Sequence, residues 1–257
     1  MRPLPYIGIT GFTSRSEVTT VLKSRSKDSK HLVSVNVLVS SKSLRGEELR
    51  QPKRFPAREK IPGIFGDDPQ VLNLLHFNTN RPDELLHDML DAQSLAGPFC
   101  HGFQLNMAWP DIGVITEYKK MYPKNTIVLQ CGQRVIEEAG SAGALARRVT
   151  EYRDIANYVL IDQSGGQGLP LDIILARSYF AEISKEVPTI GLAIAGGLRA
   201  EALHKLYTLW KKFSDFSIDA ESKLRTDGDD LDTTKAACYL KIADTMFVKR
   251  MLGNTEA

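Results

Sequence analysis

The segment TIGLAIAGGLRAEALHKLYTLWKKFSDFSIDA, residues 189–220, decides the fold of this chain. It contains an apolar run at 189–195, a helical pattern at 198–213 and a second apolar run at 216–220. Short apolar runs that alternate with helical patterns are typical of βαβ units, in which the strands are parallel. Gly196 and Gly197 separate the first run from the helical pattern, where the chain must turn tightly.

The same alternation extends outward from this segment over the whole chain. We expect the other strands at residues 5–10, 31–41, 74–79, 101–106, 126–131 and 158–162, and a helical stretch after each strand except the second. Eight strands alternating with helices, in a chain of 257 residues, predict an α/β fold: a single (β/α)8 barrel (TIM barrel) domain over residues 1–257.

The stretch after the second strand, residues 42–70, is an irregular insertion with several prolines and little helical period. Its first part, 42–60, carries seven Lys and Arg against three Glu. Long loops in compact domains are often functional, and this one is expected at the end of the barrel that carries active sites. Two interpretations stay open: a solvated loop, or a basic lid that attracts a phosphorylated or carboxylated substrate.

Composition excludes several classes of function. A net charge of +2 is too small to indicate a nucleic-acid partner or an anionic membrane surface. No apolar run approaches the ~18 residues of a membrane helix, and the first residues lack the apolar core of a signal peptide. The three cysteines, Cys100, Cys131 and Cys238, are far apart, so we expect no disulfide framework, no metal site and a cytoplasmic location.

Polar residues at the ends of the expected strands are the candidates for a site, because barrel enzymes carry their chemistry there. A glycine cluster follows the sixth strand, and Gly196 and Gly197 precede a helix start, where free N–H groups favour phosphate. The alternative is that these glycines only make tight turns. The strand-end candidates are Thr10, Gln104, Asn106, Asp162 and Asp219, and the cluster contains Gly165, Gly166 and Gly168.

Six short blocks, in order along the chain, resemble the phosphoribosylanthranilate isomerase family. They are Ile7-Gly8-Ile9-Thr10, Ser41-Lys42-Ser43-Leu44-Arg45, Gln104-Leu105-Asn106, Leu160-Ile161-Asp162 with the glycine cluster, Ala195-Gly196-Gly197-Leu198, and Phe216-Ser217-Ile218-Asp219-Ala220-Glu221-Ser222. The resemblance implies the same barrel fold, no cofactor, a small phosphorylated or carboxylated metabolite as ligand, and a monomer or homodimer.

The resemblance also implies roles for individual residues. The family performs an Amadori rearrangement of phosphoribosylanthranilate, in which a carboxylic acid protonates the ring oxygen and a thiolate removes the C2 proton. Asp162 matches the acid, and Arg45 matches the arginine that pairs with the anthranilate carboxylate. Gln104 and Asn106 match substrate-binding positions. The glycine pairs and Ser222 match the phosphate site.

The chain departs from the family at the residues that move protons. Thr10 replaces the catalytic cysteine, and an alkyl hydroxyl does not ionise usefully at neutral pH. Gly8 replaces a lysine, Asn106 replaces a histidine, and Glu221 replaces a serine of the phosphate loop. Asp219 is the first candidate for a replacement base; Cys131 and His76 are weaker ones, because such residues are more often buried structural groups.

Three functions therefore stay open after the sequence. The first is an aldose–ketose (Amadori) isomerase of the phosphoribosylanthranilate isomerase type that acts on a phosphorylated ribosyl-amine. The second is a different barrel enzyme for a related phosphorylated or acidic metabolite. The third is a non-catalytic barrel that binds a ligand and has lost the base.

Overall fold

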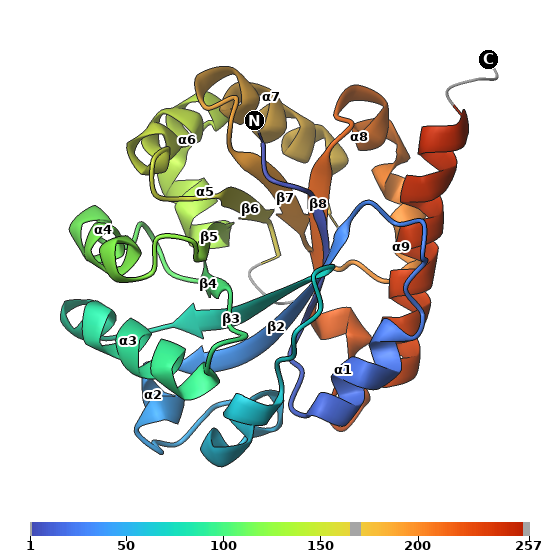
Figure 1. Cartoon of the computed structure of the whole chain (residues 1–257). Coiled ribbons are helices and arrows are strands. Elements are labelled where there is room, and N and C mark those ends of the chain that lie inside the picture. The colour runs from blue at the N-terminus through green and yellow to red at the C-terminus, as the bar shows by residue number, and fades with distance from the viewer. Residues whose placement is uncertain (1, 165–170, 254–257) are drawn as a thin grey trace.

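The chain folds into one closed barrel of eight parallel strands in sequence order, with β1 hydrogen-bonded to β8. The computed structural model describes residues 2–164 and 171–253, without the side chains of 249–253. Helices surround the barrel in Figure 1, and the predicted (β/α)8 fold is confirmed. The strands are β1 (Tyr6–Thr10), β2 (Leu32–Ser40), β3 (Val71–Asn78), β4 (Gly102–Leu105), β5 (Thr126–Gly132), β6 (Tyr158–Asp162), β7 (Gly191–Ala195) and β8 (Phe216–Ala220).

The outer layer consists of helices whose ends follow local sequence signals. Ser14 caps the first helix through a capping box with Glu17, and the Asp172 side chain caps α7. The described α-helices are α1 (Arg15–Leu22), α2 (Ser41–Leu44), α3 (Leu85–Ala96), α4 (Ile112–Met121), α5 (Gln133–Ala139), α6 (Ala142–Val149), α7 (Ile173–Glu186), α8 (Tyr207–Lys212) and α9 (Thr233–Gly253).

Short 3-10 helices occupy several connections. They are η1 (Pro52–Arg54), η2 (Arg58–Gly63), η3 (Pro82–Glu84), η4 (Thr150–Tyr152), η5 (Ala200–Leu206) and η6 (Ser222–Leu224). Two of the expected helices are divided. The stretch 134–155 breaks because Gly140, at φ 67°, ends α5 and Ser141 caps α6. The stretch 198–213 begins as η5 and becomes α-helical only at Tyr207.

The inside of the barrel is apolar at the amino ends of the strands and polar at their carboxyl ends. An apolar cluster fills the first part, with Tyr6, Leu72, Leu74, Val128, Tyr158, Leu160 and Ala193. The next inward positions toward the carboxyl ends are buried polar side chains: Thr10, Asn36, His76, Gln104, Gln130, Asp162 and Asp219. Buried polar groups must find hydrogen-bond partners inside the protein. The packed apolar half therefore carries a connected polar layer that faces the barrel mouth.

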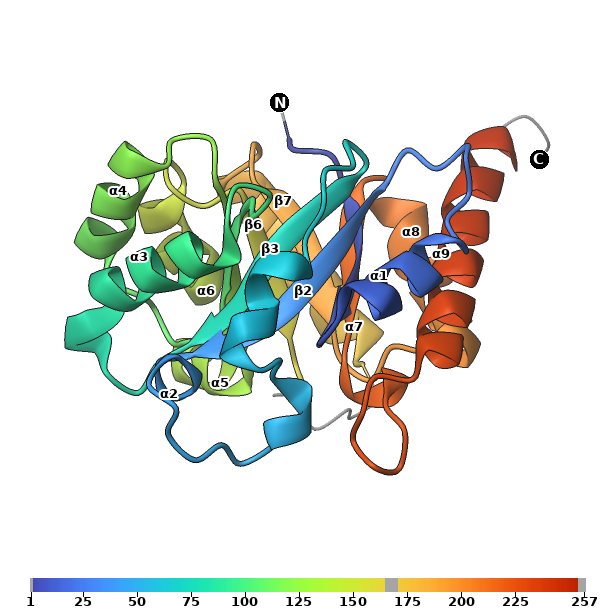
Figure 2. The same ribbon diagram turned by 60° about the horizontal axis from the view of Figure 1, so that its bottom comes forward.

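The insertion between β2 and β3 lies over this mouth. It contains only the short α2, η1 and η2, which confirms the expected loss of a regular second helix. Figure 2 shows the insertion and the loop before α9 together at the end of the barrel opposite the N-terminus. Arg54 joins the two segments, since its guanidinium binds Glu221 at 2.9 Å and Asp229 at 2.8 Å.

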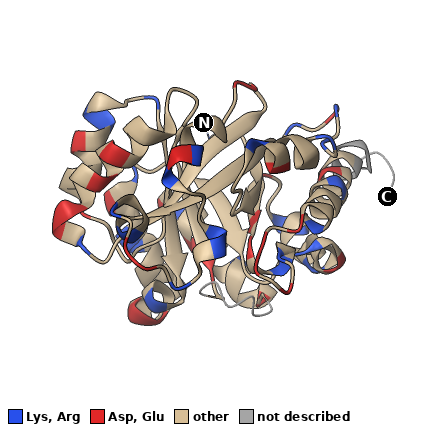
Figure 3. Ribbon diagram, turned by 90° about the horizontal axis from the view of Figure 1, so that it is seen from below, with Lys and Arg blue, Asp and Glu red and all other residues tan. Residues whose placement is uncertain are grey.

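Charged residues of both signs occur on the outer helices. In Figure 3, which views the molecule from one side, Lys and Arg are interspersed with Asp and Glu. No helix in the described part of the chain is long and apolar enough to cross a membrane.

Candidate active site

Two buried carboxyl groups, Asp162 and Asp219, face the mouth of the barrel from β6 and β8. Both are in register with Ala195 of the strand between them. Because barrel strands are tilted, Asp219 lies deeper than Asp162, and only Asp162 also lines the outer cavity. Two strand spacings separate their backbones, which is roughly 10 Å. Both side chains line the same small inner cavity. Two of the strand-end residues predicted from the sequence, Asp162 and Asp219, thus lie in the same cavity.

Two glutamines connect these carboxyl groups through one chain of hydrogen bonds. The Gln130 Nε2 donates to Asp162 Oδ2 at 3.1 Å, and the Gln130 Oε1 accepts from Gln104 Nε2 at 3.0 Å. The same Gln104 Nε2 lies 3.1 Å from Asp219 Oδ2. Because both glutamines are buried, the chain fixes the two carboxyl groups relative to each other.

Asp219 occupies the space that two sequence departures leave open. The Thr10 hydroxyl donates to its two carboxyl oxygens at 3.1 and 3.2 Å. A Cβ at Gly8 would lie 2.6 Å from Asp219 Oδ1, so any larger residue at that position would displace the carboxyl group. Thr10 is therefore a donor that positions Asp219.

The ionisation of Asp219 is shifted toward neutral pH. Burial raises the pKa of this carboxyl group to about 7, against the lowering effect of the hydrogen bonds from Gln104 and Thr10. The negative charges of Glu221 and Asp162 raise the pKa further. A carboxyl group with a pKa near the working pH exchanges protons in both directions, as a general acid or base requires.

Asp162 is held in a fixed orientation by three donors. The backbone N–H and hydroxyl of Ser164 donate to its Oδ1 at 3.0 and 2.8 Å, and Gln130 binds its Oδ2. The side chain lines both the inner cavity and a larger outer one. It is placed to meet a ligand that enters from the mouth.

His76 takes part in this polar layer. Its Nδ1 lies 3.1 Å from Gln104 Nε2, and its Nε2 lies 3.1 Å from Asn106 Nδ2. Burial lowers the pKa of the imidazole, so the ring is neutral at pH 7. An amide nitrogen only donates and a neutral ring accepts at only one nitrogen, so in this arrangement His76 accepts a hydrogen bond from one of the two predicted substrate-binding amides.

Three adjacent cavities form the mouth. The largest, about 560 Å³, is lined by polar side chains that include Asn78, Asn106, Gln130, Asp162 and Glu221. A second, about 430 Å³, lies against the insertion and is lined by Arg50, Arg54, Phe55 and His76. The inner cavity, about 30 Å³, contains Asp219 and the loops after β7 and β8. Glu221 lines all three, so the cavities meet at this residue.

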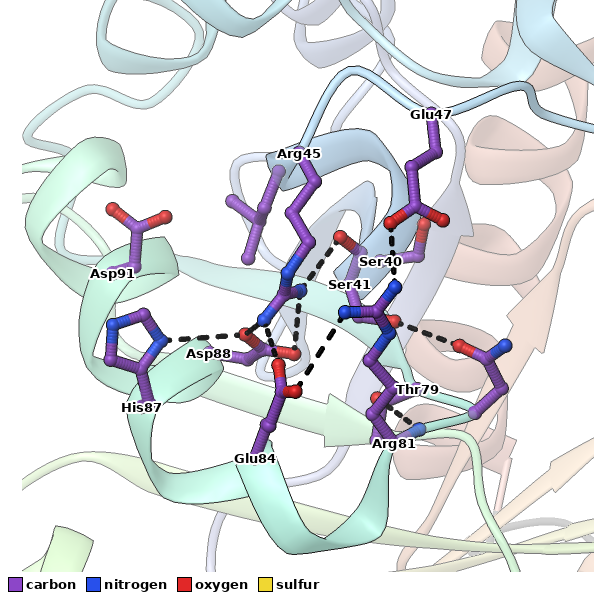
Figure 4. A network of polar contacts seen from close by, with 12 residues as sticks. Ser40, Ser41, Arg45, Glu47, Thr79, Arg81, Glu84, His87, Asp88 and Asp91 are labelled. Atoms are coloured by element: carbon purple, nitrogen blue, oxygen red, sulfur yellow. Dashed lines mark hydrogen bonds and ion pairs between the residues drawn. The ribbon is translucent and has the colours of Figure 1, made fainter.

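Arg45 lies apart from these cavities. Its guanidinium binds the buried carboxylate of Asp88 at 2.6 Å, the carboxylate of Glu84 and the Ser41 carbonyl oxygen, on the side of α3 (Figure 4). It is not among the residues that line the three cavities. A buried carboxylate is costly without a cation, and Arg45 pairs with Asp88. The guanidinium that the resemblance assigned to a substrate carboxylate is therefore already bound within the protein. Arg45 is thus a bridge between α2 and α3.

The predicted phosphate-binding residues are only partly described. Gly165, Gly166 and Gly168 lie outside the described residues. Gly196 and Gly197 adopt φ angles of 127° and 57°, which favour glycine, and both line the inner cavity together with Ser222. The carboxylate of Glu221 shares that lining.

Cys131, a weaker candidate base, points away from the mouth. It packs in the core between barrel and helices, and burial raises the pKa of its thiol to about 12. A thiol with this pKa stays protonated at neutral pH and removes no proton. Among the described residues, no group of three or more His, Cys, Asp or Glu is arranged to hold a metal ion.

Sequence reasoning missed three residues of the site. Gln130 and Asn36 lie on inward positions of their strands, so strand parity contained a signal for both. Arg54 lies in the insertion, where no periodicity tells which side chains turn inward.

Comparison with known proteins gives a fold-level match. No family model and no curated protein matches the chain. A phosphoribosylanthranilate isomerase structure from Thermotoga maritima has a TM-score of 0.62 and 19% identity, over 95% of this chain and 100% of that one. The isomerase from Pyrococcus furiosus gives 0.61 and 17%, over 94% and 99% of the two chains.

The chain shares its fold with the phosphoribosylanthranilate isomerases. A third structure of that group, 17% identical with a TM-score of 0.60 over 95% of this chain and 100% of that one, is a complex with reduced 1-(o-carboxyphenylamino)-1-deoxyribulose 5-phosphate. At such low identity the likeness establishes the architecture alone. The residues at the mouth must carry any statement about activity.

Proposed function

We propose that this chain is an isomerase of the aldose–ketose type that transfers protons on a small, sugar-derived substrate in the barrel mouth. The observation that carries the proposal is the Asp219 carboxyl group, whose pKa of about 7 and contact with Thr10 supply a base beside the position of the missing cysteine. The sequence resemblance implies a ribosyl-amine substrate, and the proposal keeps the aldosylamine part of it.

The two carboxyl groups divide the chemistry of an Amadori rearrangement. Asp162, in its protonated form, gives a proton to the ring oxygen, the C1–O bond breaks, and the nitrogen lone pair forms a C1=N iminium. Asp219, as carboxylate, removes the proton from C2, the C–H electrons form the C1=C2 bond of an enolamine, and the C1=N π electrons return to nitrogen. The C2 hydroxyl then gives its proton to Asp162 and C1 takes the proton from Asp219, which gives the ketose and restores both carboxyl groups.

The remaining lining suits a polyhydroxylated ligand. Asn78, Asn106, Gln130 and Gln133 present side-chain amides to the largest cavity. Each amide offers both donors and acceptors, which is what sugar hydroxyls require. The apolar half of the barrel below excludes water from the space around Asp219 and strengthens its electrostatic interactions.

Exchange and turnover assays test this proposal. Purified protein is incubated in D2O with phosphoribosylanthranilate and a panel of aldoses and aldosylamines, and ¹H NMR follows exchange at C2 and ketose formation. We expect turnover of at least one compound, with a loss of ~100-fold or more in D162N and D219N. D91N, which removes a surface carboxylate bound to Arg58, serves as the matched control and keeps full activity.

Two outcomes contradict the proposal. If D219N retains the wild-type rate, Asp219 is not the base. If neither exchange nor turnover occurs with any compound of the panel, the chain is not such an isomerase, and a barrel that only binds its ligand becomes the better account.

A further inference from the structure

The loops after β7 and β8 face each other across the inner cavity. The β7 loop contributes Gly196 and Gly197, both in left-handed backbone conformations, just ahead of η5. Barrel enzymes frequently bind phosphate between these two loops, with backbone N–H groups and a helix start. The opposite loop brings Glu221 into the same lining, directly after the last residue of β8.

The charge of this cavity opposes an anion. Among the described residues of the lining, Asp162, Asp219 and Glu221 contribute three carboxyl groups, against one ammonium group, that of Lys223. Arg54 holds the Glu221 carboxylate at 2.9 Å, and the Glu221 side chain is only 20% exposed. A phosphate between the glycines and Glu221 would therefore meet a fixed like charge in partly dehydrated surroundings, where repulsion is strong.

The inner cavity is also narrow. Its volume is about 30 Å³, and it meets the two larger cavities at Glu221. Removal of the Glu221 side chain would widen this junction and make the lining less negative.

We infer that Glu221 is a specificity-determining residue that excludes phosphate from the β7–β8 position, so that the substrate presents an uncharged, hydroxyl-bearing end there. The part of this inference that concerns the substrate rests on the proposed isomerase function. It limits the substrate class to polyhydroxy compounds that have no phosphate at the end near Glu221. A carboxylate accepts hydrogen bonds from hydroxyl groups, which makes Glu221 a suitable partner for such an end.

Calorimetric titration of three probes tests the inference: inorganic phosphate, ribose 5-phosphate and ribose. E221Q removes only the charge, whereas E221S also removes volume. We expect wild type to bind ribose more tightly than ribose 5-phosphate. E221S binds both phosphate probes at least ~10-fold more tightly than wild type does, and E221Q shows a smaller gain because its side chain still fills the space.

Asp229 supplies the matched control. It binds the same Arg54 guanidinium as Glu221, and D229N changes the net charge by the same amount, but Asp229 does not line the three cavities. D229N is therefore expected to bind phosphate within about twofold of wild type. Melting temperatures verify that each variant is folded.

The inference is overturned if wild type prefers ribose 5-phosphate to ribose. It is also overturned if E221S and E221Q, both folded, bind phosphate no more tightly than wild type does. Failure of the proposed function is a separate result, because it is read from turnover in D162N and D219N, whereas phosphate binding requires no proton transfer.

Discussion

At the scale of single residues, two differences from the resembling family form one arrangement with Asp219. Gly8 leaves the space that the Asp219 carboxyl group fills, and Thr10 donates a hydrogen bond to it. Taken one at a time, Gly8 and Thr10 each replace a reactive side chain of the family with one that cannot exchange a proton at neutral pH. Taken together they accommodate a buried carboxyl group with a pKa of about 7. In the proposed function, Asp219 takes the place of the cysteine as proton acceptor.

The pKa of Asp219 predicts a pH-dependent cost to the fold. Its pKa is about 7 in the folded chain and ~3.9 in an unfolded one. Between these values only the folded state holds the proton, so this group's contribution to stability is present at pH 4 and is lost as pH rises through 7. D219N removes the buried charge, and we expect it to raise the free energy of unfolding by on the order of 2 kcal/mol at pH 8.

Urea denaturation at pH 8 and pH 5 measures this difference. At pH 5 the folded protein holds Asp219 mostly protonated, so the stabilising effect of D219N should be much smaller there. Equal effects at both pH values would mean that Asp219 does not titrate in this window.

Gly8 gives a second residue-scale prediction. In G8A the new Cβ would lie 2.6 Å from the Asp219 carboxyl oxygen, which Thr10 and Gln104 hold in place. We expect a loss of ~1–3 kcal/mol in stability from overpacking, together with reduced turnover. The control is G63A, because a Cβ at Gly63 meets nothing within 4 Å. Thermal unfolding in which G8A is as stable as G63A would disprove the close contact.

At the scale of elements, the insertion after β2 carries two arginines with different tasks. Arg45 binds α3 through Asp88, whose side chain is only 2% exposed. Arg54 reaches the mouth and binds the loop before α9. The family motif indicated Arg45 as a ligand-binding residue. In the structure, Arg54 is the arginine of the two that lines a cavity at the mouth.

The pairing of Arg45 predicts a structural phenotype without a binding one. R45M leaves the Asp88 carboxylate buried without its cation, so the melting temperature should fall by a few degrees. Ligand affinity should stay at the wild-type value, because Arg45 does not line the cavities. Calorimetric unfolding and titration on the same sample measure both quantities. A large rise in the dissociation constant at unchanged stability would show that Arg45 contributes to ligand binding after all.

At the scale of the whole molecule, the alternation of apolar runs and helical patterns was enough to predict the fold from the sequence. The strands β6 and β8 were predicted at their observed bounds, and all eight strands were expected in the right order. Barrel enzymes carry their chemistry at the ends of the strands, which is how Asp162 and Asp219 were found. Buried inward positions thus follow from local pattern and the rules of the fold.

What the sequence could not predict depends on three-dimensional surroundings. The orientation of Arg45 follows from a buried carboxylate 43 residues away in the chain. The role of Arg54 depends on how an aperiodic insertion crosses the mouth. The pKa of Asp219 results from burial and from neighbours on β1 and β4. Contacts of this kind leave no periodic trace in the chain.

The account depends most on Asp219 exchanging its proton near neutral pH. A ¹³C NMR titration of aspartate carboxyl groups, with Asp219 assigned by the signal lost in D219N, measures this directly. We predict a titration midpoint near pH 7. A midpoint below about pH 5, close to that of an ordinary aspartate, would contradict the account, because Asp219 would then be a permanently charged carboxylate that is too weak a base for the proposed step.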